Sequence, residues 1–128
     1  MKIKLNVMFT VSAVVLFLLG LGLTFMTSFI HGMIGLEPNP ASLHFAKAAG
    51  GTMLGFAAMA WFARNSGPSQ ARNGLVLGFT LFYLLTGIEY IRSIMVGSLQ
   101  FMGWIMAGMW LLLFVFMALA GKSSMTES

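Results

Sequence analysis

The stretch LNVMFTVSAVVLFLLGLGLTFMTSFIHGMI, residues 5–34, contains no Asp, Glu, Lys or Arg. A helix needs about 20 mostly apolar residues to cross the ~30 Å hydrocarbon core of a bilayer, so this segment is long enough to span a membrane. It is longer than the ~7–15-residue core of a signal peptide, and no A-x-A site directly follows it. We therefore expect a retained helix that tilts or extends beyond the bilayer.

The rest of the chain shares this apolar character. Of its 128 residues, 59% are hydrophobic and 8% are charged, and the mean hydropathy is +0.91. Soluble domains carry about 25% charged residues, so the composition indicates an integral membrane protein. The absence of cysteine excludes disulfides and thiolate chemistry. The seven Lys and Arg residues are scattered singly, so they form no basic patch for nucleic acid.

Turn-forming sequences divide the chain into four apolar segments. GLEPNPAS, residues 35–42, ends the first, because proline is excluded from helix interiors. Within it, Asn39 followed by Pro40 is typical of the start of the next helix. NSGPSQARN and VGSLQ separate the later segments. An even number of spans with short links predicts an all-α membrane protein, an antiparallel four-transmembrane-helix bundle in one domain. The expected spans are about residues 5–34, 42–63, 71–95 and 101–121.

The basic residues predict the orientation of these spans. Lys2, Lys4, Arg64, Arg72 and Lys122 all fall on one side of the membrane if there are four spans. The loops on the other side contain no Lys or Arg outside the helix ends. Because cytoplasmic loops carry an excess of Lys and Arg, we expect both termini to be cytoplasmic.

Two G-x-x-x-G motifs mark candidate packing faces. Gly51 and Gly55 lie in the second span, and Gly74 and Gly78 lie in the third. Small residues at this spacing let helix backbones approach closely in lipid. We expect these glycines to pack the bundle internally, with a homodimer face as the alternative.

The stretch GIEYIRS, residues 87–93, places charges inside the third span. Glu89 and Lys47 are expected at similar depth in the outward half of the bilayer, since the second and third spans run in opposite directions. Ionisable groups within a span cost roughly 2.5–3.5 kcal/mol each at the helix centre and usually pair. A Lys47–Glu89 ion pair is the economical interpretation, with Arg92 as a second cation.

Other polar side chains are expected near this outward end. His44 precedes Lys47 by one turn, and His31 and Glu37 lie in the facing loop. The cluster is either a structural ion pair that fixes helix register or a small outward-facing site for an anionic headgroup, a quinone-like ring or a proton. Ligation of a metal or haem by the two histidines lacks supporting ligands, so we expect no metal and no cofactor.

Several stretches resemble a known group of proteins. LFLLGLGLTF, IGLEPNPASLHFAKAAGGTMLGFAAMAWFARN, ARNGLVLGFTLFYLLTG and GWIMAGMWLLLFVFMAL together cover most of the chain. They resemble small bacterial four-helix membrane proteins of unknown function, loosely DoxX-like. The resemblance implies a four-helix bundle in the bacterial cytoplasmic (inner) membrane. It transfers no catalytic residue.

The sequence favours a non-enzymatic function. It contains no P-loop, nucleophile elbow, zinc-protease motif or dinucleotide fingerprint. We expect an accessory or scaffolding subunit that packs against a larger membrane complex. Its partners would be membrane lipids and other membrane-protein subunits or further copies of itself, and not nucleic acid. The alternatives are a lipid- or small-molecule-binding protein or minimal transporter, and a His-ligated membrane redox protein.

Overall fold

The computed structural model describes residues 4–97, 99 and 101–127, the last three of these by backbone alone. Within these residues there are five helices and no strand, so the all-helical class is confirmed. The helices are α1 (Leu5–Phe25), α2 (Thr27–Ile34), α3 (Pro40–Ala63), α4 (Gln70–Met95) and α5 (Met102–Glu127).

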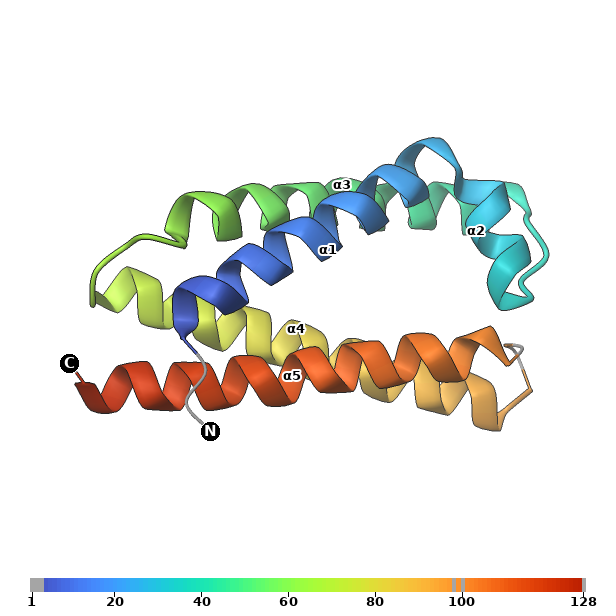
Figure 1. Ribbon diagram of the computed structural model, residues 1–128. Helices are drawn as coiled ribbons and strands as arrows, with labels where there is room; N and C mark the ends of the chain where they lie inside the picture. Colours follow the sequence, from blue (N-terminus) through green and yellow to red (C-terminus); the bar gives the residue numbers. More distant parts are fainter. Residues whose placement is uncertain (1–3, 98, 100, 128) are drawn as a thin grey trace.

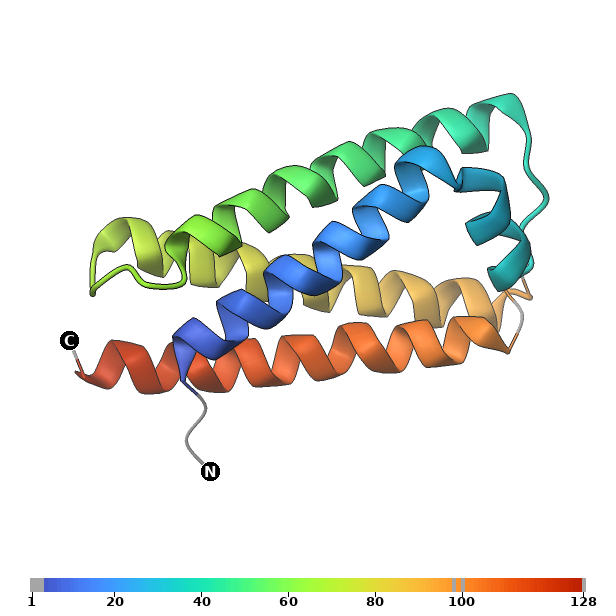
Figure 2. The same cartoon turned by 45° about the horizontal axis from the view of Figure 1, so that its top comes forward.

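The four long helices run alternately up and down along the chain, as Figures 1 and 2 show. The start of α1 and the end of α5 therefore lie at one end of the molecule, and α2 lies at the other. By length and composition α1, α4 and the part of α5 up to Ser124 can cross a membrane, which supports a membrane protein. The remaining long helix, α3, has 24 residues and is not among these candidate spans.

The first span is shorter than the expected range 5–34. The helix breaks at Met26, where φ is −123° and ψ is 42°, and α2 then turns across the end of the molecule. One cause is packing, because α2 buries Thr27, His31 and Ile34. At its far end, Gly35 adopts φ 85°, and the Leu36 N–H donates to the His31 carbonyl at 2.8 Å. This Schellman-type turn ends the helix and leads into the proline-rich link.

The expected helix start at Asn39 and Pro40 is confirmed. The Asn39 side chain accepts from the Ser42 N–H at 3.0 Å, and the Ser42 hydroxyl accepts from the Asn39 N–H at 3.0 Å. This capping box satisfies two backbone donors, with Pro40 in the first helical position. At the start of α4, Ser69 accepts from the Arg72 N–H at 3.1 Å in the same way.

The closest backbone approaches divide the fold into two helical hairpins, α1 with α3 and α4 with α5. Glycines permit both approaches. A Cβ added at Gly50 would lie 2.6 Å from Thr24 Oγ1 and 3.0 Å from the Gly20 carbonyl oxygen of α1. A Cβ added at Gly87 of α4 would lie 2.7 Å from Leu111 Cδ2 of α5. Only a residue without a side chain fits these two positions as they stand.

Between the two hairpins, aromatic side chains fill the interior. Phe56 of α3 lies 5.3 Å from Phe82 of α4 by ring centroids, and Phe82 lies 5.5 Å from Trp110 of α5. The Tyr83 hydroxyl donates to Ser12 Oγ of α1 at 2.5 Å, and both residues are fully buried. Large rings thus span the wider gap between the hairpins, and one buried hydrogen bond links them.

The two neighbouring glycines of α3 give a direct test of this packing. Gly50→Ala is expected to lower the melting temperature in detergent, because overpacking a close contact costs about 1–3 kcal/mol. Gly51→Ala is expected to leave it unchanged or raise it, since a Cβ at Gly51 meets nothing within 4 Å and alanine favours a helix. The opposite ranking of the two variants would contradict the observed contact.

Candidate functional site

Glu89 and Arg92 of α4 pair with each other. Arg92 donates from Nη2 to Glu89 Oε1 at 2.7 Å and from Nε to Oε2 at 3.0 Å, one helical turn apart. Ser93 Oγ lies 3.5 Å from the same Oε1. The side chains of Arg92 and Glu89 are 71% and 57% exposed. This bidentate geometry neutralises both charges within one helix, so the pair needs no partner from another span.

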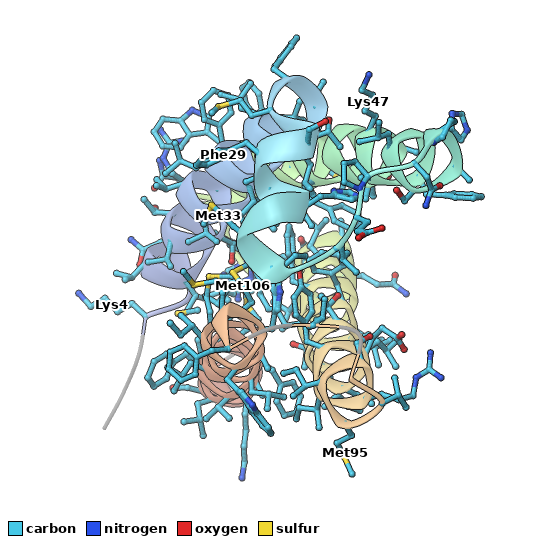
Figure 3. All side chains as sticks on the ribbon, turned by 90° about the vertical axis from the view of Figure 1, so that its right-hand side faces the viewer. Lys4, Phe29, Met33, Lys47, Met95 and Met106 are labelled. Carbon is cyan, nitrogen blue, oxygen red and sulfur yellow. The ribbon has the colours of Figure 1, made fainter. Side chains whose placement is uncertain are left out.

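The expected ion pair between Lys47 and Glu89 is wrong. Lys47 is exposed on α3, and no contact joins it to the carboxylate of Glu89. Figure 3 views the molecule from the α2 end and shows Lys47 projecting away from α4 and α5. The physical reason is the helix pairing: α3 packs on α1 and α4 packs on α5, and α3 and α4 are not among the closely packed pairs.

The face of α4 that carries the charges points away from the interior. Its buried face consists of Val76, Phe79, Tyr83 and Gly87. Glu89 and Arg92 lie on the opposite side, where Gly78 and Leu85 are also exposed. Their helical spacing places these residues on one face. The expectation that Glu89 pairs with another span is wrong because this face lies outside the bundle.

The histidines and Glu37 lie near the same end without forming a site. His31 was expected in a loop, but it is 4% exposed within α2, and its Nδ1 lies 3.1 Å from the Thr27 carbonyl. His44 is exposed and its ring centroid lies 5.6 Å from that of Phe45. Glu37 is exposed in the link between α2 and α3. Among the described residues, no three His, Asp or Glu side chains gather as metal ligands would.

The glycines of both G-x-x-x-G motifs are open. A Cβ added at Gly51, Gly55, Gly74 or Gly78 would meet nothing within 4 Å, and all four residues are exposed. The expectation that these motifs pack the bundle internally is therefore wrong. Close internal contacts use Gly20, Gly50 and Gly87 instead. Gly51 and Gly55 are exposed on α3, and Gly74 and Gly78 of α4 are exposed at a small hollow that Phe56 and Met59 of α3 also line.

The opposite end of the molecule contains a basic cavity of about 450 Å³. It lies where α1 begins, α3 ends, α4 begins and α5 ends. Lys4, Arg64 and Arg72 line it, and none of the described lining residues is acidic. The other lining residues are apolar or neutral and polar: Leu5, Asn6, Phe9, Ala63, Asn65, Ser66, Ala120, Ser123 and Ser124.

Arg72 is the best-anchored cation of this cavity. Its Nη1 donates to the Ser66 carbonyl at 3.1 Å and its Nη2 donates to Ser124 Oγ at 2.5 Å, which connects the α3–α4 loop to α5. Its Nε is buried and has no hydrogen-bond partner among the described residues. Arg64 donates to the Trp61 carbonyl and places its guanidinium carbon 3.7 Å from the centroid of the Trp61 ring. Two guanidinium groups are therefore held in place at the cavity.

An apolar groove of about 460 Å³ follows α1 and α3. Val14 and Phe17 line it from α1, and Ala58, Trp61 and Phe62 from α3. Val14, Phe17, Trp61 and Phe62 are exposed, which is expected of side chains that face lipid. Trp61 belongs to the groove and stacks on Arg64 of the basic cavity, so the two hollows adjoin along one helix pair.

The sequence interpretation missed two features. It treated Lys4, Arg64 and Arg72 only as signals of membrane orientation. It did place all three on one side of the membrane, and the bundle brings the helix ends of that side together. It also missed the bond between Ser12 and Tyr83, two polar side chains that lie among the buried residues of their helices. Their positions among apolar neighbours are a signal that could have suggested a contact.

Comparison of the chain with protein-family models, with curated proteins and with solved structures finds no match. The structural class of this protein is therefore defined by its fold alone. The chain is an all-helical protein with three helices able to cross a membrane, an outer surface with open glycines, and a basic cavity at one end.

A double-mutant cycle tests the arrangement of charges at the end of the molecule where α2 lies. Glu89→Gln and Arg92→Gln are expected to have less than additive effects on the melting temperature, because each removes the same pair. Glu89→Gln and Lys47→Gln are expected to be additive, because no contact joins these residues. Thermal unfolding in detergent measures all the variants, and coupling between Lys47 and Glu89 would contradict the helix pairing.

Proposed function

We propose that this chain is a non-enzymatic integral membrane protein that acts as an accessory or scaffolding subunit. Its partner is a larger membrane protein, whose transmembrane helices pack on the open glycine faces of α3 and α4. The observation that carries the proposal is the exposure of Gly51, Gly55, Gly74 and Gly78, none of which has a neighbour within 4 Å of an added Cβ.

The physical argument comes from how helices associate in lipid. Lipid tails are as apolar as leucine, so helix association depends on close packing at small residues. Each open motif places two glycines one turn apart on a surface that the protein itself leaves uncovered.

The proposal includes four spans, with α3 as the fourth. A helix of 24 residues is about 36 Å long, which is enough to cross the hydrocarbon core. Its antiparallel packing on α1 supports a common depth for the two helices. Lys4, Arg64, Arg72 and Lys122 lie at the end where α1 begins and α5 ends, which favours cytoplasmic termini. Lys2 lies outside the described residues.

A bacterial cytoplasmic membrane and a DoxX-like relationship are part of this proposal. Both rest on the resemblance of the apolar stretches described above. The two alternative functions have less support from the geometry. Lys47, His44, Glu89 and Arg92 do not line the basic cavity or the apolar groove. The two histidines are engaged separately, His31 with Thr27 and His44 beside Phe45.

Substitution of the open glycines tests the proposed docking. We expect the double variants Gly51→Ile with Gly55→Ile, and Gly74→Ile with Gly78→Ile, to reduce recovery of a companion membrane protein. A loss of about 1.4 kcal/mol of binding free energy corresponds to a tenfold decrease in affinity. We therefore expect at least about tenfold less companion protein to be recovered with a variant of the docking face. The measurement is quantitative co-purification of the tagged chain from native membranes in a mild detergent.

The matched control is Gly108→Ile, which places the same side chain at an open glycine of α5 outside both motifs. This variant is expected to recover the companion normally, and all variants are expected to melt near the wild-type temperature. Unchanged recovery in both double variants would overturn the docking proposal. Recovery of further copies of the chain alone would replace the larger partner with self-association.

A further inference from the structure

The basic cavity has the features of a binding site for an anionic group. Lys4, Arg64 and Arg72 reach it from three different segments, and among the described residues no carboxylate lies within ion-pair distance of any of them. Arg72 presents a buried Nε that has no partner, although its two terminal nitrogens are bonded. The terminal nitrogens keep further N–H donors, and the uncompensated positive charge of Arg72 favours an oxyanion in the cavity that it lines.

The position of the cavity indicates the depth of its ligand. It lies at the ends of four long helices, three of which can cross a membrane, so it lies near the level of the lipid headgroups. A phosphate diester carries a negative charge and oxygen acceptors. It therefore suits the guanidinium donors of the cavity better than a neutral ligand does. Ser66 and Asn6 add further polar groups to the rim.

The adjoining groove accounts for the rest of such a ligand. It is lined by Val14 and Phe17 of α1 and by Ala58 and Trp61 of α3, all apolar. The stacked pair of Arg64 and Trp61 joins the cationic cavity to the apolar groove. An acyl chain fits the groove chemically, and its headgroup would then lie beside Arg64.

We propose that the cavity and the groove together bind an anionic phospholipid, with its phosphate among Lys4, Arg64 and Arg72 and an acyl chain along α1 and α3. None of the four motif glycines lines the cavity or the groove, and lipid binding is measured on this chain alone, so the proposal is tested apart from the subunit role. Arg72 also has a structural role, because it connects the α3–α4 loop to Ser124 of α5. The test therefore leaves Arg72 intact.

The experiment measures lipid binding by the full chain in detergent, using native mass spectrometry and thermal unfolding. Phosphatidylglycerol is the anionic probe, phosphatidylcholine is the zwitterionic probe, and inorganic phosphate tests the headgroup chemistry alone. We expect wild-type protein to bind phosphatidylglycerol in preference to phosphatidylcholine, and added salt to weaken the binding. The double variant Lys4→Gln with Arg64→Gln is expected to lose about tenfold or more in affinity, because it removes two charge-assisted contacts.

Two matched controls separate this site from general charge and general bulk. Lys122→Gln removes an exposed cation of α5 that does not line the cavity, and it is expected to change the affinity by less than about twofold. Val14→Trp fills the groove and is expected to weaken binding of phosphatidylglycerol. Val11→Trp adds the same bulk at an exposed position of α1 outside the groove and is expected to leave binding unchanged.

Three results would overturn the proposal. The first is equal binding of phosphatidylglycerol and phosphatidylcholine. The second is an equal loss of affinity in Lys122→Gln and in the double variant, which would mean that net charge alone attracts the lipid. The third is that inorganic phosphate alone reproduces the thermal shift while Val14→Trp has no effect, which would assign the cavity to a soluble anion.

Discussion

The close contact between α1 and α3 determines which residues of this protein face outward. At this contact an added Cβ on Gly50 would lie 3.0 Å from the carbonyl oxygen of Gly20, so the two backbones lie closer together than a side chain at Gly50 would normally allow. Successive residues of a helix are rotated by about 100°, so fixing Gly50 against α1 turns Gly51 away from it. The same rotation places Gly55 and Lys47 on exposed parts of α3.

This constraint explains why the sequence predicted the helix starts and the long apolar segments better than the faces on which the helices pack. Helix starts at Asn39 and Ser69 follow from local hydrogen bonds, and the long apolar segments follow from composition, so these parts could be predicted. Gly50 and Gly51 are adjacent, and a pattern of small residues does not decide which of them contacts another helix. The choice depends on which helices are neighbours, and the pairing of α1 with α3 and of α4 with α5 is a tertiary property. The predicted Lys47–Glu89 pair failed for this reason.

The break at Met26 is a second tertiary effect. The local sequence of residues 5–34 is apolar throughout, so its composition predicts one continuous helix. In the fold, α2 leaves the axis of α1 and buries Thr27, His31 and Ile34 at the end of the molecule. His31 thereby becomes a buried residue whose ring contacts the backbone of its own helix, although the sequence analysis placed it in a loop. The two ends of the protein consequently differ: α2 covers one, and the other holds the basic cavity.

The most direct test of the central claim is cysteine cross-linking in native membranes, which the absence of native cysteine makes possible. A Cβ added at Gly20 would lie 2.9 Å from Leu54 Cγ and 3.0 Å from the Gly50 carbonyl oxygen. The pair Gly20→Cys with Leu54→Cys is therefore close enough for a disulfide once α1 and α3 move apart slightly. The account predicts efficient cross-linking of this pair and none for Lys47→Cys with Glu89→Cys. Efficient cross-linking of the second pair without the first would contradict the helix pairing on which the outward faces depend.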